Sequence, residues 1–306
     1  MKILVTGGAG FIGSHLVDQL IFNRHQVYIV DNLSTGKKEN LNKKAEFLKT
    51  DVQNPNLRKV FEDCKFDIVF HLAAQVDVSE SAKNPKKDAL ANIFGTLNVL
   101  DLAAKNKVKK IILAHSVACF GEPQYLPIDE KHPIGPISFY GLSKYTAATY
   151  AQLYSQNYNL PYVINIFANV YGPRQNPLGE GGVVAVFTYK MLKGIAPEIF
   201  GNGKQTRDFI FVEDVVDAIL SSTKLENEIL TIGTEKETSI NDLYKKLASL
   251  LNFEKKPIYK PKKEGDIFRS VLSIKKAKKL LGFTPKTPLD IGLGKTINYF
   301  KKEFLS

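Results

Sequence analysis

Short apolar runs alternate with longer segments of helical periodicity through the first half of the chain. Alternating strands and helices of this length are typical of a parallel sheet that carries helices on both of its faces. We expect strands at residues 2–6, 26–30, 45–48, 68–72, 110–114 and 162–167, and the clearest helices at 14–22, 88–106 and 138–158.

Beyond Pro173 the alternation is less regular. A helix is expected at 183–193, a strand at 209–212 and two helices within 239–306. Because ligands of open α/β sheets bind at the carboxyl ends of the strands, we expect the substrate between two lobes. The predicted lobes are an α/β domain at 1–168, to which the chain returns around 205–235, and a smaller α+β lobe at 169–306.

Glycines at positions 7, 10 and 13 separate the first predicted strand from the first helix. In such a turn one glycine allows the tight bend, one lets the backbone approach a pyrophosphate, and one lets the helix pack closely on the strand. The second strand leads into Asp31, about 20 positions after Gly10, where a carboxylate binds a ribose 2′-hydroxyl and repels a 2′-phosphate. The turn therefore predicts a Rossmann-type, doubly wound dinucleotide-binding domain that prefers NAD over NADP.

The composition is that of a globular protein: 306 residues, 44% hydrophobic and 24% charged. No apolar run reaches the roughly 18 residues of a membrane span. The first strand begins at Lys2, which leaves no room for a signal peptide. Cys64 and Cys119 have no paired spacing and favour a reducing compartment, so we expect a cytoplasmic protein without a membrane partner. The five histidines share no ligand-like spacing, and no metal site is expected.

The formal net charge of +11, from 42 Lys+Arg and 31 Asp+Glu, raises the question of nucleic-acid binding. The lysines form short scattered clusters, such as Lys37-Lys38 and Lys278-Lys279, without interleaved aromatic residues or a recognisable nucleic-acid module. We interpret them as a solvated surface and expect no nucleic-acid partner. A positive field also favours the capture of a polyanionic small substrate.

Tyr140 and Lys144 lie four residues apart in the predicted helix at 138–158, so both side chains lie on one helix face. A tyrosine with a pKa near 10 is a poor base at neutral pH, and lowering that pKa by about three units requires roughly 4 kcal/mol of preferential phenolate stabilisation. A neighbouring lysine and the positive nicotinamide ring of NAD⁺ could together supply it. After a dinucleotide-binding turn, the pair predicts acid–base catalysis coupled to hydride transfer.

Six segments match the motifs of one enzyme family: TGGAGFIG at residues 6–13, DNLSTG at 31–36, HLAAQ at 71–75, YGLSK at 140–144, NVYGPR at 169–174 and QTRDF at 205–209. On these motifs the chain resembles the extended short-chain dehydrogenases/reductases of the NAD-dependent sugar epimerase/dehydratase family. Within that family it is most similar to the UDP-glucose (UDP-galactose) 4-epimerases. The resemblance covers nearly the whole chain.

The resemblance implies a role for each matching residue. Tyr140 is the expected acid–base, Lys144 orients the nicotinamide ribose and tunes Tyr140, and Ser116 hydrogen-bonds the reacting hydroxyl. NAD is the implied cofactor, a UDP-sugar the implied substrate, and a homodimer formed through a four-helix bundle the implied assembly.

The other implied roles concern binding. The cofactor-binding residues implied are Gly7, Gly10, Phe11, Ile12, Gly13, Asp31, Asn32, Ser34, Thr35, Gly36, Asp51, Val52, Leu72, Ala73, Ala74, Gln75, Asn92, Tyr140, Lys144 and Phe167. The substrate-binding residues implied are Ser116, Tyr140, Asn169, Val183, Phe200, Arg207, Lys263, Asp266, Arg269 and Ser270.

The residues after Ser116 distinguish reactions within the family. Sugar 4,6-dehydratases carry an Asp-Glu pair there, and nucleotide-sugar decarboxylases keep a glutamate at the position of Ala118. Here Val117 and Ala118 supply no carboxyl group, which favours 4-epimerisation of a UDP-hexose through a transient 4-keto intermediate. A dehydratase, a decarboxylase, another epimerase and a non-catalytic nucleotide-binding protein on the same fold remain alternatives.

Ser270 matches the family position beside the C2 substituent of the sugar, where a small residue tolerates an N-acetyl group. We therefore expect UDP-GlcNAc and UDP-GalNAc to be accepted besides UDP-glucose and UDP-galactose. His115, Cys119, Phe120 and Phe139 depart from the family's motifs, but none of these departures removes a catalytic group.

Overall fold

The computed structural model describes residues 1–178, 182–262, 265 and 267–305. The chain forms two units. Unit 1 comprises Met1–Cys119, Pro136–Ile166 and Val216–Leu230, and unit 2 comprises Phe120–Gly135, Phe167–Val215 and Thr231–Ser306. The chain thus leaves unit 1 two residues before the boundary expected at 168 and returns to it within the range 205–235. It also makes an excursion into unit 2 at Phe120–Gly135 that the sequence did not predict.

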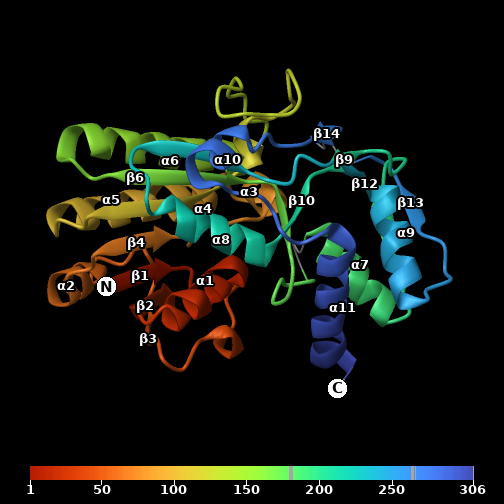
Figure 1. Ribbon diagram of the computed structural model, residues 1–306, viewed down its shortest axis with the longest axis horizontal. Coiled ribbons are helices and arrows are strands. Elements are labelled where there is room, and N and C mark those ends of the chain that lie inside the picture. Colours follow the sequence, from red (N-terminus) through yellow and green to blue (C-terminus); the bar gives the residue numbers. More distant parts are fainter. Residues whose placement is uncertain (179–181, 263–264, 266, 306) are drawn as a thin grey trace. The chain divides into compact units, whose positions relative to one another are not determined.

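A seven-stranded sheet forms the centre of unit 1 and confirms the predicted Rossmann-type fold (Figure 1). Its first strand in the sequence, β1 (Lys2–Thr6), lies in parallel register with β2 (Gln26–Asp31) on one side and β4 (Ile68–His71) on the other. The strand order reverses at this point, where open α/β sheets bind their ligands. The complete order is β11 (Glu228–Ile232), β6 (Tyr162–Phe167), β5 (Lys110–Ser116), β4, β1, β2 and β3 (Glu46–Lys49).

Helices flank this sheet. Helix α1 (Phe11–Phe22) contacts β1 and β2 (Figure 1). Helix α5 (Gly95–Lys105) contacts both α2 (Leu57–Cys64) and α6 (Phe139–Tyr158). The central strands are apolar and almost fully buried, as parallel strands covered on both faces must be. The remaining helices of this part of the chain are α3 (Val78–Lys83), α4 (Pro85–Ala89) and α8 (Val212–Ser222), with 3₁₀ turns η1 (Lys38–Asn40) and η3 (Val117–Cys119).

The helix predicted as one segment at 88–106 is interrupted. Five residues, η2 (Leu90–Phe94), form a π-helix between α4 and α5. A π segment accommodates one extra residue in a helix and so rotates the side chains that follow it. The hydrophobic periodicity continues across the segment, which explains why the sequence predicted an unbroken helix.

Unit 2 is built from small sheets and longer helices. Strand β9 (Thr206–Arg207) pairs with β12 (Thr238–Ser239) and β14 (Arg269–Ser270), while β7 (Asn169–Tyr171) pairs with β10 (Phe209–Phe211) and β8 (Glu198–Phe200) with β13 (Ile258–Lys260). The strand expected at 209–212 is therefore β10. The helix expected at 183–193 is α7 (Val183–Leu192). The tail contains three helices rather than the two predicted: α9 (Ile240–Leu251), α10 (Lys275–Leu281) and α11 (Leu289–Leu305).

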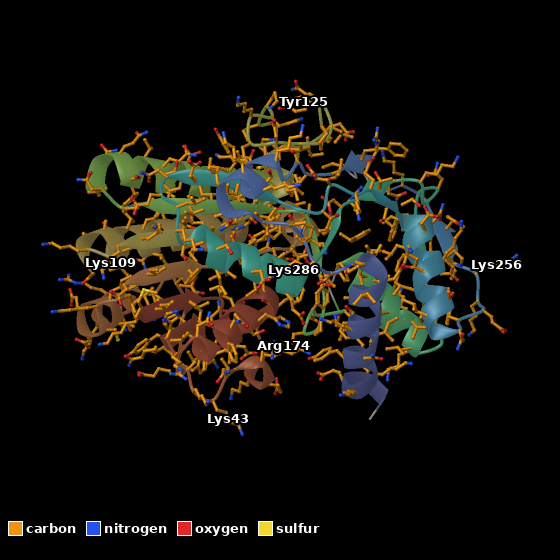
Figure 2. The ribbon with its side chains drawn as sticks, in the orientation of Figure 1. Lys43, Lys109, Tyr125, Arg174, Lys256 and Lys286 are labelled. Carbon is orange, nitrogen blue, oxygen red and sulfur yellow. The ribbon has the colours of Figure 1, made fainter. Side chains whose placement is uncertain are left out.

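Lysines are dispersed over the surface of both units. Figure 2 shows Lys43, Lys109 and Lys256 extending outward from three separate segments, and all three residues are exposed. Some lysines are neutralised locally, as Lys109 is by Asp67 at 2.8 Å. Within the residues that the structure describes, no helix is long and apolar enough to span a membrane.

Two glycines of α11 provide a matched test of packing in unit 2. A Cβ at Gly292 would lie 2.1 Å from the hydroxyl oxygen of Tyr171, a side chain that is 1% exposed and has no room to move. We expect Gly292→Ala to lower the free energy of unfolding by about 1–3 kcal/mol through overpacking. At Gly294 a Cβ would meet nothing within 4 Å, so Gly294→Ala should raise stability by up to about 1 kcal/mol. Denaturant unfolding measures both, and equal effects of the two substitutions would contradict this account.

Candidate active site

The turn after β1 brings three glycines into close backbone contact. Gly7 adopts a φ of +71°, and its N–H donates to Val30 O at 2.9 Å. A Cβ at Gly13 would lie 2.1 Å from Gly7 O, so only glycine lets α1 begin this close to the strand. Gly10 is the N-cap residue of α1 and, having no side chain, leaves the first N–H groups of the helix open to an anion. Phe11 and Ile12, which form the first turn of α1, are half-buried.

Asp31 ends β2 beside this turn. One carboxylate oxygen accepts the N–H of Ala9 at 3.0 Å and the other accepts the N–H of Leu33 at 2.8 Å. A Cβ at Gly36 would lie 2.9 Å from Asp31 Oδ1, so the backbone after the strand closes tightly over the carboxylate. Asp31 is thereby fixed while each oxygen keeps a further lone pair for a ribose hydroxyl.

The other residues expected to bind the cofactor lie around the same sheet edge. Asn32 donates to Asp51 at 2.7 Å, which links the ends of β2 and β3. A Cβ at Gly7 would lie 2.7 Å from Ala73 N, so the ends of β1 and β4 approach one another through backbone. The remaining members are Ser34 and Thr35, which are exposed, Leu72, Ala73, Ala74 and Gln75, which are half-buried, and Val52 and Phe167, which are buried.

Asn92 lies in η2 with its amide fully engaged by protein groups. Its Oδ1 accepts the N–H of Gln75 at 2.8 Å, and its Nδ2 donates to Gln75 O at 3.0 Å and to Ser143 Oγ at 3.0 Å. Asn92 therefore shapes the cofactor side of the site by fixing the segment after β4, rather than by presenting a free amide.

Tyr140 and Lys144 lie in the first turns of α6, one turn apart, and each is 9% exposed. Ser138 caps this helix by accepting the N–H of Gly141 at 3.0 Å. A Cβ at Gly141 would lie 2.4 Å from Ala118 O, so the helix begins directly against the backbone that follows Ser116. Lys144 Nζ donates to Ala114 O at 2.7 Å. The predicted catalytic residues are thus brought together at the carboxyl end of β5.

The protonation states of this group are set by burial. Burial raises the pKa of Tyr140 to about 12, although a hydrogen bond with Ser116 works in the opposite direction. Burial lowers the pKa of Lys144 to about 8. The charges of Asp88 and Cys119 raise the pKa of Tyr140 further, so the expected lowering by Lys144 together with the nicotinamide ring of NAD⁺ stays a prediction.

Two histidines lie close to Lys144. Burial, reinforced by the positive charge of Lys144, lowers the pKa of both His71 and His115 to about 3. Both are therefore neutral at physiological pH and serve as hydrogen-bonding groups rather than as cations. In the part of the chain that the structure describes, no group of His, Cys, Asp and Glu side chains could hold a metal ion.

The residues expected to bind substrate in unit 2 are partly brought together. Arg207 and Ser270 are register partners in the paired strands β9 and β14. Arg269 is held by Glu237 in a two-point ion pair, with nitrogen–oxygen distances of 3.0 and 2.6 Å. Asn169, Val183 and Phe200 lie in β7, α7 and β8, while Lys263 and Asp266 lie outside the described residues.

The groups around the glycine turn fit a dinucleotide cofactor. The uncapped start of α1 suits a pyrophosphate, and the fixed carboxylate of Asp31 suits a ribose diol. An additional side-chain atom at Gly7 or Gly13 would collide with backbone, so the cradle exists only because these positions are glycine.

Comparison with known proteins agrees with this geometry. The chain is 47% identical over 300 residues to a Methanocaldococcus jannaschii protein provisionally designated a UDP-glucose 4-epimerase, with 98% of each covered. A UDP-glucose 4-epimerase of Thermotoga maritima, solved with UDP-glucose, superposes with a TM-score of 0.98 at 44% identity over 99% of each chain. A Thermus thermophilus UDP-glucose 4-epimerase complexed with NAD superposes with a TM-score of 0.93 at 34% identity, over 98% of this chain and 99% of that one.

A family-level match covers most of the sequence. Residues 3–233 match the model described as the NAD dependent epimerase/dehydratase family. This range contains the glycine turn, Asp31 and the Tyr140–Lys144 pair that the structure brings to one edge of the sheet. The chain therefore belongs to the NAD-dependent epimerase/dehydratase family.

Proposed function

We propose that the protein is a UDP-sugar 4-epimerase, an isomerase that inverts C4 of UDP-glucose or UDP-galactose with NAD as cofactor. The observation that carries the proposal is the grouping of Tyr140, Lys144 and Ser116 beside a dinucleotide-binding turn, with no carboxyl group at Val117 or Ala118. The epimerases among its relatives, one of them solved with UDP-glucose, support the same reaction.

Residues of the protein itself carry out the proton transfer in this reaction. Tyr140 Oη removes the C4-hydroxyl proton and later returns it, while Ser116 hydrogen-bonds the same oxygen. Lys144, held by Ala114 O, places a positive charge beside the developing negative charge. When bound at the glycine turn, NAD would supply the hydride chemistry at C4. Substrate and product have the same oxidation state, so the cycle consumes no reductant.

The alternatives need groups that the chain lacks at the relevant positions. Expelling water from C5 and C6 requires an additional acid and base, and decarboxylating relatives keep a glutamate where Ala118 stands. A purely nucleotide-binding protein would not need a buried tyrosine and a buried lysine one helix turn apart. The dehydratase, decarboxylase and binding-protein interpretations are therefore less well supported.

The first test is incubation of the purified protein with UDP-glucose, without and with added NAD, followed by chromatographic separation of the 4-epimers. We expect UDP-galactose to form without net NADH production. If the nicotinamide ring of bound NAD⁺ lowers the pKa of Tyr140 below that of Lys144, turnover should decline above about pH 8 as Lys144 loses its proton. Tyr140→Phe should lower the rate by a factor of about 10²–10⁴ with little change in thermal stability. Absence of any epimer with added NAD would refute the proposal.

Sugar selectivity provides a second test. Ser270 is small and 5% exposed, and it lies in register with Arg207. We propose that it leaves space for an N-acetyl group, so UDP-GlcNAc should be epimerised as well as UDP-glucose. Ser270→Tyr should reduce turnover of UDP-GlcNAc at least tenfold while the rate with UDP-glucose, the internal control, changes less than threefold. Equal losses for both sugars would argue against a role in selectivity.

We propose further that the protein is a homodimer. Helix α6 packs against η2 and α5, and the outward faces of these helices expose large apolar side chains that water would otherwise solvate. A second copy of the same surface would bury them in a four-helix bundle. The exposed side chains are Leu90, Phe94, Leu142, Tyr145 and Leu153.

Substitution within this surface tests the assembly. Phe94→Asp combined with Leu142→Asp should convert the dimer to a monomer, measured by light scattering after size-exclusion chromatography. Phe22 is 78% exposed but lies in α1, so Phe22→Asp provides the matched control and should leave the mass unchanged. A monomeric wild-type protein would exclude the dimer.

We also propose a cytoplasmic location. Cys64 and Cys119 are both free thiols in the structure, and Cys119 is buried. Free thiols of this kind persist where the surroundings are reducing, which supports that location.

A further inference from the structure

Asp88 is a buried carboxylate that the proton transfer does not use. It is the fourth residue of α4 and is 1% exposed, although an aspartate is seldom buried so completely without a specific partner. No motif of the sequence drew attention to it. The hydrogen bonds that Asp88 accepts explain how its carboxylate can be buried.

The side chain of Asp88 accepts hydrogen bonds from two groups at the edge of the site. Gln75 Nε2 donates to Asp88 Oδ1 at 3.0 Å, and Asn92 Nδ2 donates to the same oxygen at 3.1 Å. Gln75 follows β4, whose end lies against the glycine turn, and Asn92 lies in η2. The carboxylate therefore ties the segment after β4 to the π-helix.

The connection continues into the catalytic helix. Asn92 Nδ2 also lies 3.0 Å from Ser143 Oγ, and Ser143 Oγ in turn donates to Tyr140 O at 3.0 Å. The two hydrogens of the Asn92 amide are shared among three acceptors, namely Gln75 O, Asp88 Oδ1 and Ser143 Oγ. Ser143 stands between Tyr140 and Lys144 in the sequence and is 3% exposed. A buried hydrogen-bonded network of this kind holds its members in one arrangement, because each unpaired group would be costly.

The helical spacing of Asn92 from Asp88 brings these groups together. Asn92 lies in the middle of η2, and its carbonyl oxygen accepts the hydroxyl of Thr96 at 2.6 Å. Asn92 lies in this π segment four residues after Asp88, a spacing at which helical side chains meet. Such segments occur often at functional sites, where they direct a particular side chain.

The charge of Asp88 also acts on the catalytic pair. Its negative charge raises the pKa of both Tyr140 and Lys144, while Cys119 acts on both in the same direction. The other titratable groups near Lys144 are His71 and His115, which are neutral. The carboxylate is thus positioned to keep Lys144 protonated.

We propose that Asp88 is a positioning residue for the epimerisation, an inference that rests on the proposed function. Its carboxylate fixes Asn92 between the segment after β4 and the first turns of α6, and its charge balances the Lys144 ammonium. Asp88 does not touch the reacting atoms. It acts through the placement and protonation of Tyr140 and Lys144.

The test compares Asp88→Asn, which keeps the shape but removes the charge, with Asp88→Ala, which removes both. For Asp88→Asn we expect both limbs of the kcat profile to move to lower pH by about one unit, because a lost negative charge disfavours the ammonium and favours the phenolate. Asp88→Ala should in addition lower kcat at least tenfold. Asp101→Asn removes an equal charge from a surface pair with Lys105 and should leave the profile in place.

A spectroscopic readout separates this proposal from the proposed function. The ionisation of Tyr140 can be followed as the difference in phenolate absorbance between each protein and its Tyr140→Phe counterpart, in the holoenzyme and without turnover. The midpoint should fall by about one pH unit in Asp88→Asn even if the substrate proves to be another sugar. An unshifted midpoint would overturn the inference, and so would failure of Asp88→Asn to fold, because the carboxylate would then serve folding alone.

Discussion

The site depends on buried polar groups that must satisfy one another, because hydrogen bonds hold the start of the catalytic helix. A Cβ at Gly141 would lie 2.4 Å from Ala118 O, so the start of the helix approaches that backbone closely. Two hydrogen bonds fix its first turn: Ser138 caps it, and Ser81 Oγ accepts the N–H of Tyr140 at 3.1 Å. Hydrogen bonds are directional, so they fix the orientation of Tyr140 more narrowly than apolar contact would.

The same requirement links the glycine turn to this helix. Thr6 Oγ accepts the N–H of Ala73 and lies 2.8 Å from His71 Nδ1, while His71 Nε2 lies 2.9 Å from Thr96 Oγ. Since the hydroxyl of Thr96 donates to Asn92 O, it accepts from His71, which assigns the imidazole proton to Nε2. Because burial keeps His71 neutral, Nδ1 is then the acceptor for the hydroxyl of Thr6. A continuous line of polar groups joins the cofactor cradle to η2 and the residues that hold Tyr140.

The sequence predicted those parts of the fold and site that local chemistry determines. The strand before Gly7, the acid at the end of β2 and the Tyr140–Lys144 spacing all follow from short-range rules, and the family match confirmed the fold and the reaction class to which they point. The π segment was not predicted, because one inserted residue hardly changes the hydrophobic periodicity of a helix.

Other features could not be predicted, because they depend on contacts between residues that are far apart in the sequence. The segment Phe120–Gly135 joins unit 2 through pairing of Ile128 with Leu272, far along the sequence. Asp88 lies in none of the sequence motifs, and its role depends on hydrogen-bond partners that come close to it only in the folded protein. The charge balance around Tyr140 has the same origin. Burial leaves Tyr140, His71 and His115 neutral, and the carboxylate of Asp88 raises the pKa of the buried Lys144. In a buried site the effective dielectric constant is low, so the transfer of a single proton changes the electrostatic energy of both groups. The geometry of a few hydrogen bonds therefore determines the chemistry.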